Sequence, residues 1–220
     1  MKYIDLENWK RKEHYKFFHR MDYSQFNICM DIDVSNFIKF TKQNGLSFYY
    51  SMIYASTTVI NQIENFKYRI HDNNVVLHDK INPLFTDMSK NGQDDLFKLI
   101  FVELNDDIYE FEKNAKETNK NQRAYLELDK LNGRDDLIYI TCIPWISFTH
   151  VSHPISLNKN DSIPRISWGK YYKHEDRTLL PFSVQANHAL IDGFHIGKYI
   201  DKLQTFIDEI NNLYTPKGYK

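Results

Sequence analysis

The chain has 220 residues, enough for a single domain with a sizeable hydrophobic core. Apolar residues make up 42% of the sequence and aromatic residues 15%, a composition that excludes a disordered chain. The 28 basic and 29 acidic side chains are interspersed and leave a formal net charge of −1. The sequence therefore lacks the basic surface of a nucleic-acid-binding protein and the polybasic patch of a membrane-binding one.

Two further patterns concern the cellular location. The N-terminal residues lack the charged and then apolar pattern of a signal peptide, and no run of about 18 apolar residues predicts a transmembrane helix. Cys29 and Cys142 lie far apart in the sequence and suggest no disulfide framework. We expect a reduced, cytoplasmic protein in which residues 1–220 form one domain.

In the first part of the chain, apolar periodicity predicts strands and helices separated by turn-forming residues. The Asn44-Gly45 pair ends one helix, and an Asp-Asn turn after His71 is typical of a β-hairpin. The expected elements, in chain order, are a strand at Gln25–Asp33, helices at 34–43 and 47–65, a hairpin of 66–70 and 75–78, and a strand at 83–88.

The second part of the chain continues this alternation. The expected elements are an exposed polar helix at 104–120, core strands at 138–142 and 145–151, strands at 165–172 and 179–187, and a final helix from 193 to about 214. Ile196, Ile200, Leu203 and Ile207 give this last helix a clear apolar face. The sequence therefore predicts an α/β fold: a single two-layer domain with a mixed β-sheet and packed helices.

The main candidate site lies where the strand at 179–187 meets the last helix. Phe182, Val184 and Ala186 share one face of that strand, and His188 continues their parity, so the strand carries His188 out of the core. A histidine in this position is a candidate general base because its ordinary pKa lies near neutrality. Asp192 is placed to cap the following helix.

Other interpretations of these residues remain open. A half-buried histidine beside a capping aspartate can be purely structural. His188, Asp192 and His195 are acceptable zinc ligands, but a helix that starts at Asp192 leaves His188 outside it, and we expect no metal. Cys142 could act as a nucleophile with His188 as its base, provided that its setting is electropositive and accessible. His150 and His153 are expected at the surface.

Several segments resemble the chloramphenicol acetyltransferases. Residues 185–198, QANHALIDGFHIGK, are similar to the family signature HHxxxDG followed by FH, with Asn187 in place of the first histidine. Residues 9–15, WKRKEHY, resemble the family's W-x-R-[KR]-E-H-[FY] segment, and residues 140–148, ITCIPWISF, resemble one of its strands. The resemblance covers nearly the whole chain and implies a trimeric enzyme that uses acetyl-CoA.

The resemblance also implies a mechanism. His188 takes the proton from an acceptor hydroxyl, which attacks the thioester of acetyl-CoA in a ternary complex. Thr141 stands at the position of a family serine whose hydroxyl stabilises the oxyanion. Arg11 pairs with Asp192 to hold the loop of the base, as a structural ion pair and not a proton relay. No covalent acyl-enzyme is needed.

The remaining site residues follow from the same resemblance and belong to the two substrates. The CoA side is lined by Tyr49, Trp145, Lys170 and Tyr171, and the acceptor side by Phe17, Phe18, Phe26 and Ser167. We expect a homotrimer whose sites form at the subunit interfaces, with the histidine facing the neighbour's pocket. The implied acceptor is chloramphenicol, and the implied role is inactivation of that antibiotic.

Four departures from the family pattern concern the acceptor side. Phe18 stands where a tyrosine is common, Asp22 where an apolar residue is usual, and Tyr139 where an asparagine is common. The loop at residues 89–95 is about two residues longer than usual. These positions keep open an acetyltransferase of this fold that acts on another hydroxyl compound. Asn187, in place of the first histidine, keeps open a non-catalytic homologue that only binds CoA or another ligand.

Overall fold

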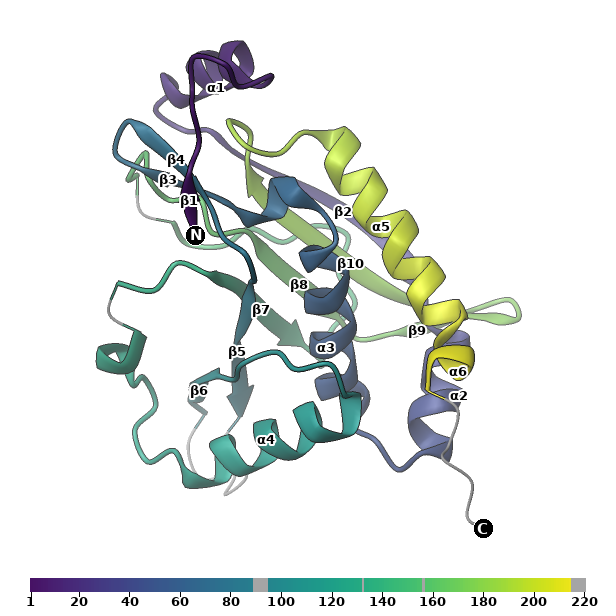
Figure 1. The fold of residues 1–220 in the computed structure, drawn as a ribbon. Helices are drawn as coiled ribbons and strands as arrows, with labels where there is room; N and C mark the ends of the chain where they lie inside the picture. Colours follow the sequence, from purple (N-terminus) through teal and green to yellow (C-terminus); the bar gives the residue numbers. More distant parts are fainter. Residues whose placement is uncertain (89–94, 132, 156, 215–220) are drawn as a thin grey trace.

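The computed structural model describes residues 1–88, 95–131, 133–155 and 157–214. Within them the chain forms a mixed seven-stranded sheet covered on one face by helices, so the predicted α/β class is confirmed (Figure 1). The strands, in spatial order, are β2 (Gln25–Asp33), β10 (Arg177–Asn187), β8 (Arg165–Gly169), β7 (Leu137–Ile143), β5 (Asn82–Met88) and β6 (Phe97–Phe101), with β9 (Tyr172–His174) paired to β10. The predicted loop at 89–95 lies almost wholly outside the described residues.

A smaller sheet packs beside the main one. Its strands are β1 (Lys2–Tyr3), β4 (Asn74–Leu77) and β3 (Tyr68–His71), so the predicted hairpin is confirmed, with Asp72 in a turn at φ 56°. Arg69 is fully buried in this hairpin, and its guanidinium donates hydrogen bonds to the backbone carbonyls of Phe66, Tyr68, Asp135 and Leu137. This arginine therefore fixes the small sheet against the start of β7.

The helical layer is built around one apolar helix. The helices are α1 (Lys12–His19), α2 (Ser35–Gln43), α3 (Phe48–Asn61), α4 (Ile108–Asn121), α5 (Gly193–Asp208) and α6 (Ile210–Leu213), with 3₁₀ turns at Glu64–Lys67 and Leu128–Leu131. Helix α3 lies between the sheet, α4 and α5, and Met52, Ile53, Ala55 and Val59 are completely buried. Among the described residues, no helix combines the length and the apolarity needed to cross a membrane.

Two of the predictions about secondary-structure elements are wrong. No strand forms at 145–151, because the chain turns at Pro144 and Trp145 and crosses over the end of β8, where the Lys170 N–H donates to the Ile146 carbonyl at 2.7 Å. Helix α4 is also not an exposed helix, since Phe111 and Ala115 are fully buried. Its polar composition hides a narrow apolar face that packs on α3.

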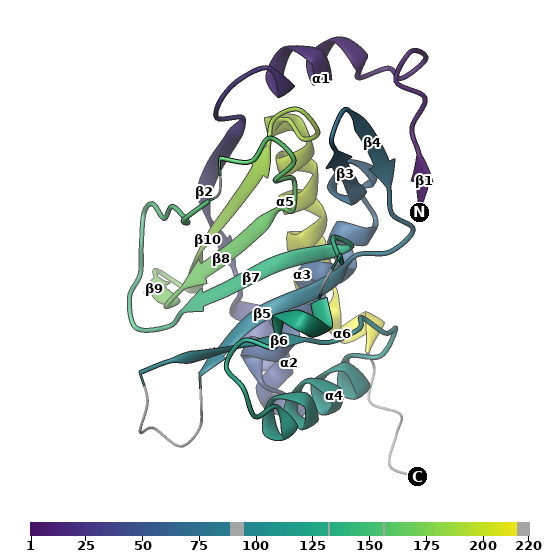
Figure 2. The same ribbon diagram turned by 90° about the vertical axis from the view of Figure 1, so that its left-hand side faces the viewer.

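The directions of the strands divide the sheet into two functional ends. Strands β5, β7 and β8 run parallel to one another, whereas β10 runs antiparallel to β8. The carboxyl end of β10 therefore lies at the opposite end of the sheet from the carboxyl ends of β5, β7 and β8, as Figure 2 shows. Helix α1 lies across the end where β10 finishes and α5 begins.

A substitution at Gly169 tests the packing of residues 146–148 over the end of β8. A Cβ at this position would lie 2.7 Å from the Ile146 carbonyl oxygen and 3.0 Å from the Phe148 ring, so Gly169→Ala must displace the crossing chain. We expect a loss of about 1–3 kcal/mol in the free energy of unfolding, measured by urea denaturation.

Gly197 provides the matched control. It lies within α5, and a Cβ there meets nothing within 4 Å. Gly197→Ala should stabilise the protein by about 0.5–1 kcal/mol because alanine loses less backbone entropy in a helix. Equal effects of the two substitutions would contradict the packing described for residues 146–148.

Candidate active site

Arg11 holds the loop that follows β10. Its guanidinium donates to both carboxylate oxygens of Asp192, from Nη1 at 2.5 Å and from Nη2 at 2.6 Å. It also donates to the backbone carbonyls of Ala189 at 2.7 Å and His188 at 2.8 Å. The Arg11 side chain is only 10% exposed, so this two-pronged ion pair is shielded from water and strengthened. The ion pair implied by the resemblance is present.

The His188 ring lies at the surface end of the loop between two aromatic side chains. Phe18 of α1 stacks on it with ring centroids 3.8 Å apart and an interplanar angle of 11°, and Phe26 of β2 lies 4.5 Å away. Nδ1 of His188 is 3.2 Å from Oδ1 of Asp192 without a hydrogen bond between them, and the side chain is 32% exposed. Phe17, 62% exposed, packs edge-on against Phe18. The imidazole is thus oriented by packing and remains accessible.

Asp192 occupies the N-cap position of α5, as the sequence predicts, but both of its carboxylate oxygens serve Arg11. The backbone N–H of Asp192 donates to Nδ1 of His195 at 3.0 Å. Burial, followed by the charge of Arg11, lowers the pKa of His195, which suits a neutral ring whose Nδ1 accepts. His195 is therefore committed to the helix start, and the described residues contain no group of three or more metal-binding side chains.

Asn187 is buried, and its side-chain amide makes two hydrogen bonds that stabilise the turn before His188–Asp192. Its side chain is buried, its Nδ2 donates to the Asp161 carbonyl at 3.0 Å, and its Oδ1 accepts from the Ala189 N–H at 2.9 Å. The departure from the family's first histidine is thus accommodated by hydrogen bonds that shape the same turn. The position of His188 does not depend on a second imidazole.

A cavity of about 630 Å³ lies at the opposite end of the sheet, within the usual range for small-molecule sites. It opens at the carboxyl ends of the parallel strands β5 and β7. Its walls include three of the predicted site residues, Tyr49, Thr141 and Trp145, and also His153. Carboxyl ends of parallel strands commonly form ligand sites because loops diverge there.

Thr141 and Cys142 are consecutive residues of β7, and their side chains lie on opposite faces of the sheet. Thr141 pairs with Ser167 of β8, on the sheet face opposite the helices, whereas Cys142 packs against the core. Burial raises the pKa of the Cys142 thiol to about 12, so this cysteine stays protonated. Cys142 is half-buried and also lines the cavity, but a protonated thiol is a poor nucleophile, which argues against the cysteine mechanism.

The other predicted CoA-side residues lie near the same cavity mouth. The hydroxyl of Tyr49 donates to the Thr86 carbonyl, and Trp145 is 64% exposed at the rim. Tyr171, half-exposed, packs edge-on against Phe48 of α3 with ring centroids 5.7 Å apart. Lys170 is exposed at the end of β8.

His153 departs from the expectation of a surface position. His150 is exposed, but His153 is half-buried and lines the cavity, with Nε2 2.7 Å from the Ser167 Oγ. No local pattern predicts this contact, because residues 144–155 and 157–164 form an irregular connection without periodicity. Only the fold brings that connection over β8.

The structure does not bring all predicted residues together within one chain. Thr141 is aligned across β8 with Ser183, and His188 lies five residues further along the chain from Ser183. At about 3.4 Å per residue the two side chains are separated by roughly 15 Å or more along the sheet, besides two strand spacings. His188 with Arg11 and Asp192 lies at one end, and Thr141 with the cavity lies at the other.

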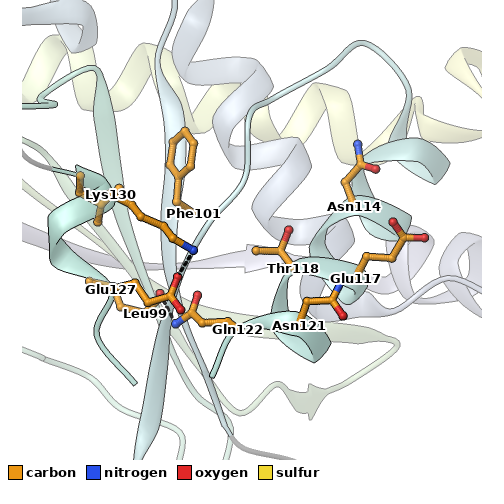
Figure 3. Close-up of a pocket in the computed structure, with 10 residues that line it drawn as sticks. Leu99, Phe101, Asn114, Glu117, Thr118, Asn121, Gln122, Glu127 and Lys130 are labelled. Atoms are coloured by element: carbon orange, nitrogen blue, oxygen red, sulfur yellow. Dashed lines mark hydrogen bonds and ion pairs between the residues drawn. The ribbon is translucent and has the colours of Figure 1, made fainter. Parts of the chain in front are cut away.

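A further cavity, of about 450 Å³, lies between α4 and the 3₁₀ turn at Leu128–Leu131. Figure 3 shows Glu117 and Asn121 of α4 on one wall and the Lys130–Glu127 ion pair on the other. None of the predicted catalytic or binding residues lines it. It plays no part in the site described above.

Comparison with known proteins bears on this arrangement. The sequence model described as Chloramphenicol acetyltransferase matches residues 1–204. The chain belongs to the chloramphenicol acetyltransferase family. A chloramphenicol acetyltransferase of Proteus mirabilis is 29% identical over 206 residues, covering 94% of each chain. One of Staphylococcus aureus is 30% identical over 211 residues, covering 95% of this chain and 97% of that protein.

Solved structures agree with the family assignment. A chloramphenicol acetyltransferase structure superposes with a TM-score of 0.85 at 27% identity, covering 94% of this chain and 99% of that one. A probable dihydrolipoamide acetyltransferase of Listeria monocytogenes superposes with a TM-score of 0.66 at 12% identity, which shows a shared fold alone.

Replacing Asp192 with asparagine tests the ion pair through its pH dependence. The hydrogen bond from Arg11 lowers the pKa of Asp192, so the folded state favours the carboxylate. This stability is present above the unfolded-state pKa of about 3.9 and is lost as the pH falls through the lower folded-state pKa. We expect Asp192→Asn to cost about 1–3 kcal/mol at neutral pH, with the difference from the wild type shrinking below about pH 4.

Asp201→Asn is the control, because Asp201 lies exposed on the same helix. Denaturation curves of the wild type and both variants, recorded across this pH range, provide the measurement. A loss for Asp192→Asn that does not change with pH would argue against an ion-pair origin.

Proposed function

We propose that this protein transfers the acetyl group of acetyl-CoA to a hydroxyl of chloramphenicol, and so inactivates the antibiotic. The observation that supports this most strongly is the set of hydrogen bonds from the Arg11 guanidinium to the His188–Asp192 loop. A guanidinium with four hydrogen bonds to one loop orients an accessible imidazole, which is what a general base requires. The relatives from Proteus mirabilis and Staphylococcus aureus carry the name of this activity.

In the proposed reaction, Nε2 of His188 accepts the proton of the acceptor hydroxyl while the hydroxyl oxygen attacks the thioester carbonyl. The tetrahedral intermediate then collapses, the C–S bond breaks, and the proton passes to the departing thiolate. Packing by Phe18 and Phe26 limits rotation of the ring, so little conformational freedom is lost when the acceptor binds. Asp192 stays ionised beside Arg11 and does not take the proton.

Thr141 is the proposed oxyanion donor. Thr141 lines the cavity, and its β-branched side chain restricts the rotamers that can present the hydroxyl. Loss of one such donor commonly raises the barrier by about 2.7–4 kcal/mol. Tyr49, Trp145, Lys170 and Tyr171 are proposed to line the CoA side, while Phe17, Phe18 and Phe26 are proposed to contact the acceptor. The expected acceptor contact of Ser167 is not available in this structure, because Ser167 is fully buried and its hydroxyl lies 2.7 Å from Nε2 of His153.

The proposed site requires a second copy of the chain. Since His188 and Thr141 lie at opposite ends of one sheet, the base of one subunit must meet the cavity of its neighbour. A cyclic homotrimer satisfies this, because each heterologous contact repeats until the ring closes. The exposed aromatic side chains Phe17 and Phe194, 62% and 78% exposed, lie beside the loop of the base and are available for such a contact.

A homologue that binds CoA without turnover is less well supported. Asn187 was the main argument for it, and the hydrogen bonds of Asn187 preserve the turn that presents His188. An imidazole that is accessible and oriented by Phe18 and Phe26 suits a general base, which binding of CoA alone does not require. Catalysis is therefore the better interpretation.

His188→Ala tests the base. Purified wild type should release free thiol from acetyl-CoA only when chloramphenicol is present, and His188→Ala should reduce kcat by at least about 10²–10⁴-fold. His174→Ala, at an exposed residue of β9, should retain full activity. Full activity of His188→Ala would disprove the assigned base, and tight CoA binding with no release by the wild type would disprove the acceptor.

Subunit mixing tests the shared site. His188→Ala should be inactive, and Thr141→Val should lose about 10²–10³-fold in kcat. When the two variants are denatured together and refolded, some sites combine an intact His188 with an intact Thr141 from the neighbour, so activity should rise well above that of either variant alone. Mixed oligomers are verified by two different affinity tags. If their activity does not exceed that of either variant alone, the site is not shared between subunits.

A further inference from the structure

His153 lies in the cavity that contains Thr141, although it comes from the irregular connection between β7 and β8. Its Nε2 is 2.7 Å from the Oγ of Ser167, a residue with no exposed surface. Ser167 is itself the β8 partner of Thr141 in the parallel pairing. Neighbouring strands are about 4.8 Å apart, so the imidazole is anchored one strand away from the proposed oxyanion donor.

Other polar side chains of the cavity already have partners. Asp87 accepts hydrogen bonds from the Tyr50 hydroxyl at 2.5 Å and from Asn119 at 2.6 Å, and the Tyr49 hydroxyl donates to a backbone carbonyl. For His153, the described residues provide a partner for Nε2 only. Nδ1 of this ring and the Thr141 hydroxyl are thus among the groups left to meet a ligand.

The surroundings favour a neutral His153. Burial, followed by the positive charge of Arg165, lowers the pKa of its imidazole. Arg165 forms an ion pair with Asp161 at 2.7 Å, and its guanidinium lies over the Tyr139 ring at 5.6 Å. A neutral imidazole held at one nitrogen presents a single hydrogen-bonding atom at the other, which is suited to an alcohol.

We propose that His153 is a specificity residue on the acceptor side, and that its Nδ1 hydrogen-bonds a second hydroxyl of a diol acceptor while Ser167 holds Nε2. The inference deepens the proposed function, on which it rests. An acceptor whose reacting hydroxyl lies next to Thr141 can place another hydroxyl one strand spacing away only if the two are close together, as in a 1,2- or 1,3-diol. Chloramphenicol is a 1,3-diol.

The test combines one substitution with one change in the substrate. Chloramphenicol is compared with the analogue that lacks its secondary hydroxyl, in the wild type and in His153→Leu. Each change alone leaves a buried hydrogen-bonding group without its partner, so each should lower kcat/KM about 10- to 100-fold. Both changes together should cost no more than one, because they remove the same contact. The KM for acetyl-CoA should be unchanged.

Two control variants separate this role from a structural one. His150→Leu removes an exposed histidine three residues earlier and should leave the preference for the diol intact. His153→Gln keeps a hydrogen-bonding side chain and should restore part of the preference for the diol. If the effects of His153→Leu and of deoxygenation multiply, or if the KM for acetyl-CoA rises equally, the proposal is wrong.

An NMR titration tests the contact between His153 and the acceptor without requiring turnover. The imidazole resonances of His153, assigned by their disappearance in His153→Leu, should shift with chloramphenicol and much less with the deoxy analogue. His188→Ala should show the same shifts although it lacks the base. Absence of a diol-dependent shift overturns the role of His153, whereas shifts without acetylation by the wild type overturn only the proposed reaction.

Discussion

The two-pronged ion pair between Arg11 and Asp192 is the interaction on which the site depends most directly. It joins the N-terminal segment to the loop between β10 and α5, through two residues that are 181 positions apart in the chain. Two further hydrogen bonds from the same guanidinium fix the backbone of His188 and Ala189. Because the arginine is 10% exposed, water competes weakly for these bonds, which favours a single conformation of the loop.

Strand direction imposes the second constraint. The antiparallel pairing of β10 with β8 sends His188 to one end of the sheet, while the parallel strands β5 and β7 open the cavity at the other. No rotamer change can bring groups together across such a separation within one chain. The division instead suits a site in which one surface supplies an oriented base and another supplies a cavity, with association of identical chains completing the chemistry.

The cavity itself follows from the alternation of side chains along β7 and β8. Ile140 and Trp168 face the helices and are almost completely buried, whereas Thr141 and Ser167 face the other side, where residues 144–155 and 157–164 cross the sheet. Buried polar groups on that side require partners, and Ser167 finds one in His153. A structural need for hydrogen bonding thus anchors an imidazole where an acceptor can be recognised.

The sequence by itself determined the alternation of strands and helices, the N-cap at Asp192 and, through the family resemblance, the pairing of Arg11 with Asp192. These are local patterns or matches to a long motif, and each survives in the structure. Only the tertiary structure decided that 145–151 is not a strand, that α4 has a buried face, that His153 lines the cavity and that His188 and Thr141 are far apart. The reason is physical: periodicity reports which face of one element is apolar, whereas strand order, strand direction and the path of irregular segments depend on contacts between residues distant in the chain.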